Sequence, residues 1–304
     1  MSAPASGTRP TLSVIVASYN SPATLEKCLE SLTAQLGPAD ELIVADCSDQ
    51  DPRLAFQREF QNVHYLNFSK RLTIPELRRE AIKISRGEIL LLTEGRVVPS
   101  SRWAAILAEA HVTHPQAPAV GGPIDFTPTS AFDSAVFFCE YGRHMPPVPD
   151  GPCEELSGAN LSYKRWALDL CCDLIDAGAW EPFLHRRLEQ HGYSLWRASQ
   201  ASVCYHNSLF FNWFFRQRFH YGRWFAAARV AGAGRLRRLV YAAFCPLLPG
   251  LLTWRLGRAV FGRGRHRAAF LRALPLILIF HATWSVGELC GYLAGAGASN
   301  RQIF

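Results

Sequence analysis

The chain has 304 residues and a formal net charge of +7 at pH 7, and this charge is unevenly distributed. From His206 onward there are 14 Arg, no Lys and one acidic residue, whereas residues 1–205 hold 18 basic and 24 acidic residues. The basic residues alternate with long apolar runs, which argues against a soluble nucleic-acid-binding face. The nine cysteines include no C-x-x-C pair, which argues against a zinc site or a disulfide framework. We therefore expect an acidic globular part, followed by a basic part that attaches to an anionic surface.

The first 51 residues predict a strand, a helix and a second strand. Residues 1–10 are small and polar, lack the apolar core of a signal peptide and are expected to form a flexible tail. Leu12–Ala17 and Leu42–Ala45 are apolar runs typical of strands buried in a parallel sheet. Between them, Ser21 is expected to cap a helix with one apolar stripe. Ser18, Tyr19, Asn20 and Asp46 follow the two strands, at the sheet edge where open α/β sheets bind ligands.

Alternation of strands and helices continues to residue 206. The pattern predicts strands at 63–68, 89–93, 119–124 and 202–205, helices at 75–86 and from Ser100 or Ser101 to about Val112, and an irregular loop with one helix at 127–151. No dinucleotide-binding or Walker A glycine motif is present in the sequence. The expected fold class is therefore α/β, with a mostly parallel sheet flanked by helices.

The S-Y-N turn at 18–20 and the aspartate at 46 resemble the inverting glycosyltransferases of family 2, which have the GT-A fold. The resemblance covers residues 11–206 and implies a catalytic domain there. It implies that Tyr19 stacks near a nucleotide base, that Asp46 reads the base edge, and that Arg78 lies near the nucleotide. A solvated position on its helix remains the alternative for Arg78.

Residues Glu94, Gly95 and Arg96 stand where the family usually has three acids, of which the last binds Mn²⁺ or Mg²⁺. Three interpretations remain open. Glu94 and His206 could rebuild a cation site, Arg96 could face the diphosphate without a metal, or the protein could be inactive. A guanidinium suits the second role because it is always charged and binds phosphate oxygens as a fork. A salt bridge between Arg96 and Glu94 is the structural alternative.

Two later segments resemble the acceptor side of the family site. Gly158 and Asn160 correspond to a segment that lines the donor-sugar and acceptor pocket. Trp180 and Glu181 occupy the place of the segment with the catalytic base, so Glu181 is the expected base, although plain helix capping would also explain it. His206 matches a histidine that many GT-A enzymes use beside the metal or the diphosphate.

The expected C-terminal region, 207–304, is helical, apolar and rich in arginine. Residues 210–230 mix aromatic residues with arginine, as interfacial helices do. Residues 239–254 are too short and too interrupted by proline to span a bilayer, and they favour an interfacial or re-entrant segment. Residues 273–297 are long enough to span, yet contain Glu288, so a single span and an interfacial hairpin both remain open.

Together these features predict an enzyme on the cytoplasmic face of a membrane. It would transfer one sugar from a nucleotide sugar, expected to be UDP-linked, to a lipid-linked or other membrane-proximal glycan acceptor. Membrane lipids would be its other partner, and nucleic acid would not be one. The alternative is a catalytically degenerate subunit that binds nucleotide or a partner protein.

Overall fold

The computed structural model describes residues 10–303, which form two compact units. One unit combines the chain up to Asp125 with Pro146–His206, and the other combines Phe126–Met145 with the chain from Asn207 onward. The expected boundary at residue 206 is therefore only one of the boundaries, because residues 126–145 leave the first unit and pack with the C-terminal helices. Of the expected N-terminal tail, residues 1–9 lie outside the described residues.

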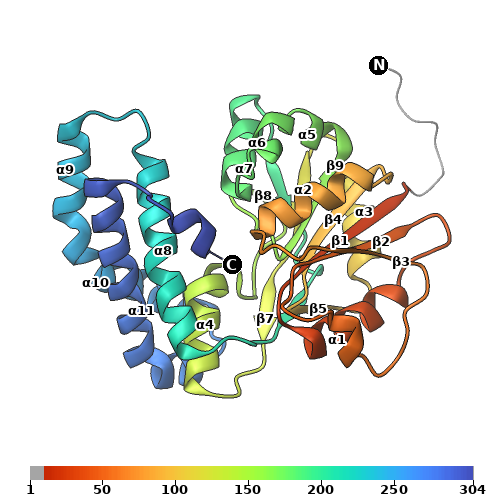
Figure 1. Ribbon diagram of the computed structural model, residues 1–304, viewed down its shortest axis with the longest axis horizontal. Coiled ribbons are helices and arrows are strands. Elements are labelled where there is room, and N and C mark those ends of the chain that lie inside the picture. Colours follow the sequence, from red (N-terminus) through yellow and green to blue (C-terminus); the bar gives the residue numbers. More distant parts are fainter. Residues whose placement is uncertain (1–9, 304) are drawn as a thin grey trace. The chain divides into compact units, whose positions relative to one another are not determined.

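A mixed eight-stranded sheet forms the centre of the first unit, with helices flanking it (Figure 1). Its strand order is β3-β2-β1-β4-β9-β6-β10-β8. The first four strands of the chain pair in parallel, whereas β9 runs antiparallel to both β4 and β6. The strands are β1 (Leu12–Ser18), β2 (Glu41–Asp46), β3 (Val63–Asn67), β4 (Ile89–Glu94), β6 (Ala119–Gly121), β8 (Gly151–Cys153), β9 (Asn160–Lys164) and β10 (Leu195–Arg197).

Helix α1 buries the apolar stripe that the sequence predicted, but the caps of α1 and α3 differ from those expected. The buried positions of α1 include Leu25, Leu29 and Leu32, yet the Ser21 side chain makes no capping hydrogen bond. Helix α3 follows Arg102 rather than Ser100 or Ser101. The helices are α1 (Pro22–Thr33), η1 (Pro52–Ala55), α2 (Ile74–Ile84), α3 (Trp103–Thr113), α5 (Arg165–Asp169), α6 (Cys172–Asp176) and α7 (Glu181–Gln190).

A small second sheet interrupts the strand that was expected at 119–124. That segment divides into β6 and β7 (Ile124–Phe126), and β7 joins β5 (Val97–Pro99) and β11 (Val203–Tyr205) in the order β5-β11-β7. The division occurs at Gly122, where a Cβ atom would lie 1.9 Å from the carbonyl oxygen of Ala201. Only glycine allows this close approach of two backbones.

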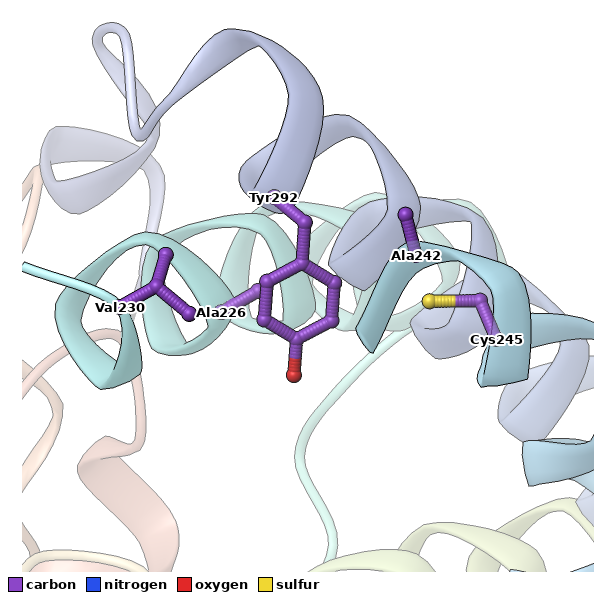
Figure 2. Packing of buried hydrophobic residues seen from close by; sticks show 5 residues of the cluster. All are labelled: Ala226, Val230, Ala242, Cys245 and Tyr292. Atoms are coloured by element: carbon purple, nitrogen blue, oxygen red, sulfur yellow. The ribbon is translucent and has the colours of Figure 1, made fainter. Parts of the chain in front are cut away.

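The second unit is helical, and α11 packs along α8, with α4, α9 and α10 also against α11 (Figure 1). Tyr292 of α11 lies in a buried cluster with Ala226 and Val230 at the end of α8 and with Ala242 and Cys245 (Figure 2). The elements are α4 (Ala131–Tyr141), η2 (Gly142–His144), α8 (Phe211–Arg229), α9 (Arg235–Phe244), η3 (Cys245–Leu247), α10 (Leu248–Arg263), α11 (Arg267–Ala294) and η4 (Ser299–Gln302).

Helices α8 and α11 run parallel, and glycines bring their backbones together. A Cβ atom on Gly222 would lie 2.4 Å from the oxygen of Trp284, and one on Gly287 would lie 2.2 Å from the oxygen of Phe219. Gly291 approaches the Arg223 oxygen equally closely. Small residues at such contacts allow the closest packing of two helices. The two helices therefore form one rigid pair.

The acid inside the apolar helix α11 is fully partnered within this pair. Glu288 is buried and accepts hydrogen bonds from Trp284 Nε1 at 2.6 Å and from the Tyr292 hydroxyl at 2.8 Å. Arg229 of α8 adds an ion pair at 3.3 Å. Burial of a carboxylate is tolerated when it has both a counter-charge and hydrogen bonds.

Candidate functional site

The carboxyl ends of β1, β2 and β4 form the edge at which the first group of site residues lies. Ser18 pairs with Asp46 in the register of β1 and β2, and Ala17 pairs with Glu94 across β1 and β4. Asp46 is buried and accepts hydrogen bonds from the Ser48 backbone nitrogen at 2.8 Å and from its hydroxyl at 2.9 Å. Burial raises the pKa of the Asp46 carboxyl, and hydrogen bonds from Ser48 and Ser18 partly oppose this.

The turns after β1 and β2 are tied together by side-chain amide and carboxylate groups. Asn20 has a φ of 46°, an unusual left-handed conformation for a residue other than glycine. Its amide donates to Asp49 Oδ2 at 2.8 Å, and its carbonyl oxygen accepts from the Asp49 backbone nitrogen at 3.0 Å. Beside this turn, the Arg71 guanidinium lies 4.8 Å from the centre of the Tyr19 ring. The turn is therefore built to hold Tyr19 in a defined orientation.

The serine side chains around position 95 leave little room for a side chain there. Gly95 begins the turn between β4 and β5, and its backbone nitrogen donates to the Ala17 oxygen at 2.9 Å. A Cβ atom there would lie 2.9 Å from Ser18 Oγ and 3.0 Å from Ser21 Oγ. An aspartate would have to displace both serines.

Arg96 and His206 meet at this same turn. The His206 backbone nitrogen donates to the Arg96 carbonyl oxygen at 2.8 Å, because β11 pairs with β5 and ends beside the turn. Burial lowers the pKa of the His206 imidazole, and the nearby Lys27 lowers it further. Both effects favour the neutral form of the His206 imidazole.

Arg78 of α2 joins the two carboxylates on which the chemistry would depend. Its Nη1 donates to Glu181 Oε1, and its Nη2 donates to Glu94 Oε1 at 3.2 Å and to the Gly158 carbonyl oxygen at 2.8 Å. The side chain is only 3% exposed, so the alternative of a solvated helix residue is wrong. Helix α2 holds it in place through a capping box between Thr73 and Glu76.

Gly158 makes space for this ion pair. A Cβ atom on Gly158 would lie 2.5 Å from Arg78 Nη1 and 2.6 Å from Glu181 Oε1. Any side chain here would separate the two charges. The glycine, the arginine and the two glutamates therefore form one arrangement, although they lie far apart in the sequence.

Glu181 is the first residue of α7, and Trp180 immediately before it is buried. The positive end of the helix dipole stabilises a carboxylate at that position. Glu181 is also buried, so its charge depends on Arg78 as well. The structure thus places the expected base beside the edge that carries Glu94.

Asn160 does not fit the expected pocket role. Its side-chain oxygen accepts from Trp103 Nε1 at 2.8 Å, and its amide nitrogen donates to the carbonyl oxygens of Pro123 and Ala201 at 2.8 and 2.7 Å. The residue is 0% exposed. Since both amide hydrogens and the oxygen are used within the fold, Asn160 holds the two sheets together rather than binding a hydroxyl group.

The side chains around Glu94 do not form the ligand set of a divalent cation. Glu94 Oε1 contacts Arg78, and Glu94 Oε2 lies 3.9 Å from Arg96 Nη2. Within residues 10–303, no three His, Cys, Asp or Glu side chains cluster closely enough to hold a metal ion. Arg96, whose guanidinium repels cations, stands where the family usually has a carboxylate ligand, and the Arg78 guanidinium occupies the other oxygen of Glu94. The Arg96 to Glu94 contact expected as an alternative is present.

Sequence reasoning missed Arg71, Ser48 and Asp49 at this edge. Their signal was weak, since they are polar residues in or near turns that follow buried strands. Sequence reasoning also did not reveal that Arg78 contacts Glu181, because the two residues lie 103 positions apart and no local pattern connects them.

Comparisons with known proteins agree with this architecture. A sequence model of glycosyl transferase family 2 matches residues 13–134. The glycosyltransferase AglE of Haloferax volcanii is 29% identical over 126 residues, which make up 40% of this chain and 41% of AglE. The chain therefore matches less than half the length of this curated relative.

Three solved structures share the fold at low sequence identity. A mannosyltransferase of Pyrobaculum calidifontis, PcManGT, in complex with GDP-Man and Mn²⁺ has a TM-score of 0.54 and 18% identity, and covers 98% of this chain and 89% of its own. TarS 1-349 of S. aureus has a TM-score of 0.51 and 14% identity, with 92% and 90% covered. GalNAc-T7 with UDP, GalNAc and Mn²⁺ has the same score and identity, with 66% and 44% covered. The chain resembles family 2 glycosyltransferases and has the GT-A fold.

The raised pKa of Asp46 predicts acid-sensitive nucleotide binding. As the pH falls, this carboxyl gains its proton at a higher pH than an ordinary aspartate and loses the negative charge that strengthens a hydrogen bond from a base N–H. We expect the affinity for UDP or GDP, measured by calorimetry, to fall more steeply between about pH 7 and about pH 4 in the natural protein than in Asp46→Asn. Parallel pH profiles of the two proteins would contradict a role of Asp46 in base recognition.

Proposed function

We propose that this chain is an inverting glycosyltransferase that moves one sugar from a nucleotide sugar to an acceptor hydroxyl. The observation that carries the proposal is the shared guanidinium of Arg78, which connects Glu181 with Glu94 at the carboxyl edge of a GT-A sheet. A displacement at an anomeric carbon needs a general base close to the place where the donor sugar binds. A UDP sugar is the proposed donor, and GDP sugars are the comparison to test, since one solved relative holds UDP and another GDP-Man.

The proposed reaction is a single displacement. Glu181 takes the proton of the acceptor hydroxyl, and the hydroxyl oxygen forms a bond to the anomeric carbon. The bond from that carbon to the diphosphate oxygen breaks, and its electron pair leaves with the nucleoside diphosphate. Attack on one face and departure from the other invert the anomeric configuration. A positioned general base of this kind raises the rate of such a reaction by about 10²-fold to 10⁴-fold.

Arginine is proposed to stabilise the departing diphosphate. Arg96 is buried to 8% exposure beside the end of β4, where its charge is weakly screened by solvent. A guanidinium fork binds phosphate oxygens at two points, so it can compensate the charge that develops as the bond breaks. His206, whose lowered pKa favours the neutral imidazole, follows the strand that pairs beside Arg96 and could donate a further hydrogen bond.

The second unit carries an apolar stripe that is suited to a lipid surface. Apart from Leu239, the exposed large apolar side chains of α9, η3 and α10 recur at intervals of three, four or seven residues, the spacing of one helix face. They are Leu236, Val240, Phe244, Leu247, Leu251, Trp254 and Phe261. Six arginines flank or interrupt the stripe, at 235, 237, 238, 255, 258 and 263. Insertion of the stripe between acyl chains would place these guanidinium groups at the lipid phosphates.

The packing of α8 on α11 favours an in-plane arrangement over a span. Both Arg235–Arg263 and Arg267–Ala294 are long and apolar enough to cross a bilayer. Because α8 and α11 touch backbone to backbone, a spanning α11 would take α8 to the same depth. Helix α8 contains Arg216, Arg218, Arg223 and Arg229. Each arginine at the bilayer centre costs about 2.5–3.5 kcal/mol on insertion scales, so we favour helices that lie in the interface.

This arrangement supports an acceptor that is lipid-linked or lies close to the membrane. The catalytic unit and the membrane-binding unit share two chain connections near residues 125 and 145 and a third at 206. An enzyme kept at a membrane meets lipid-linked acceptors at high local concentration. The cytoplasmic face is the proposed side, because loops rich in arginine are typical of that side of a membrane.

The first prediction concerns the base. Glu181→Gln keeps the shape of the side chain but removes its basicity, so turnover should fall by at least ~10² while nucleotide still binds. Sugar transfer and donor hydrolysis should be followed with UDP and GDP sugars in the presence of membranes, and Glu189→Gln on the exposed face of α7 serves as control. Undiminished turnover would remove Glu181 from the mechanism. Nucleotide binding without any turnover in the natural protein would instead support the non-catalytic alternative.

The second prediction concerns charge compensation at the diphosphate. Arg96→Ala should weaken UDP or GDP binding by ~1.5–3 kcal/mol, the scale of a charge-assisted hydrogen bond. EDTA should leave most of the activity intact, because arginine takes the place of the carboxylate ligands. Complete loss of activity in EDTA together with a harmless Arg96→Ala would show that a metal acts through other ligands.

The third prediction concerns the apolar stripe. Leu247→Glu and Trp254→Glu should each weaken sedimentation with anionic vesicles about tenfold or more, because each loses ~1.5–3 kcal/mol of apolar burial. Leu54→Glu, at an exposed apolar site of the first unit, should have no effect. High salt alone should not release the natural protein, since apolar insertion is not screened. Complete release by salt would show that only headgroup contacts are made.

A further inference from the structure

We propose that Arg78 is a positioning residue that withholds the base until the donor diphosphate binds. This inference rests on the proposed function and concerns the order of events in the same site. In the structure Arg78 neutralises Glu181, and a bound diphosphate would compete for the same guanidinium. Transfer of Arg78 to the diphosphate would free Glu181 to accept a proton.

The contacts of Arg78 show which groups a diphosphate would compete with for the guanidinium. One guanidinium contacts Glu181 through Nη1 and both Glu94 and the Gly158 carbonyl through Nη2. Of the cations in the described part of the chain, Arg78 is the one within ion-pair distance of Glu181. A carboxylate bound to an arginine is a poor proton acceptor, because protonation would leave the guanidinium without its counter-charge.

An unsatisfied donor on the same side chain indicates that Arg78 has a further anionic partner. Its Nε is buried and has no hydrogen-bond acceptor. A buried donor without an acceptor costs ~1–3 kcal/mol. Phosphate oxygens would satisfy this nitrogen together with Nη2, the terminal nitrogen on the same side of the guanidinium, in the two-point geometry that guanidinium groups form with phosphate. Because Nη2 holds Glu94 and Gly158, a phosphate there replaces those contacts first, and the proposed release of Glu181 from Nη1 follows as the guanidinium turns toward the phosphate. Glu94, which Arg78 already contacts, marks the end of the strand where the diphosphate is proposed to lie.

Withholding the base has a chemical consequence. If Glu181 were always free, it could activate water and hydrolyse the donor whenever no acceptor was bound. Linking the base to the diphosphate also imposes an order, in which the donor binds before a productive acceptor. The movement involves only the Arg78 side chain, since its helix is held by the capping box at Thr73 and Glu76.

The test measures nucleotide binding in the full-length protein, with UDP and GDP as calorimetric probes. If Arg78 must leave Glu181 to bind a diphosphate, Glu181→Gln should tighten binding by about tenfold, because the ion pair no longer competes. Arg78→Lys keeps a positive charge near both acids but loses the fork, and it should weaken binding by about tenfold. In the Arg78→Lys background, the gain from Glu181→Gln should disappear.

Control variants separate this mechanism from general electrostatics and from damage to the fold. Glu189→Gln removes an acid from an exposed site on the same helix and should leave nucleotide affinity unchanged. Circular dichroism and thermal unfolding identify any variant that fails to fold, and Arg78→Gln then replaces Arg78→Lys in the double-variant comparison. A variant that only loses folded structure would bind nucleotide more weakly, so damage to the fold does not explain tighter binding.

Two outcomes would overturn the inference. If the natural protein binds nucleotide and Glu181→Gln binds it with the same affinity, Arg78 does not move between Glu181 and the diphosphate. An equal gain from Glu181→Gln with and without Arg78 would show that only the lost negative charge matters. If the natural protein binds neither UDP nor GDP, the proposed function fails, and the inference fails with it.

Discussion

The first unit depends on the sharing of one buried guanidinium between two buried acids. Glu94 ends strand β4 and Glu181 begins helix α7. Each would be costly to bury without a counter-charge. Arg78 satisfies both, and Gly158 has no side chain because any added atom would enter this contact. The same electrostatic constraint explains why the edge tolerates a second guanidinium at Arg96, since Glu94 offers it a second oxygen.

Local pattern was sufficient for most of the first unit. The strands that end at Ser18 and Asp46 and the apolar stripe of α1 were predictable. The pattern of apolar residues that predicts them lies within a short stretch of sequence. The role of Asn160 was not, because its three partners belong to distant segments and only the fold brings them together. The helix at 131–141 was expected, but its membership of the second unit depends on packing against α11.

In the membrane-bound arrangement that we propose, the charge and the packing of the second unit together limit its depth in the bilayer. Hydropathy alone leaves a span and an interfacial hairpin equally acceptable for α11. The glycine contacts with α8 remove that freedom, because they couple an apolar helix to one that carries four arginines. Glu288 fits the same picture, since its partner Arg229 comes from α8. A sequence window that considers one helix at a time cannot detect such coupling.

The charge balance of the site follows from these contacts. Two guanidinium groups face two carboxylates, so the four side chains are neutral together. A site with three acids needs a divalent cation before it can accept a diphosphate, because the acids alone would repel it. In the proposed mechanism the positive charge is already part of the protein, and an acid at position 95 would require Ser18 and Ser21 to shift. Arginine at position 96 in place of a carboxylate would thus change the source of the compensating charge, while the GT-A sheet is retained.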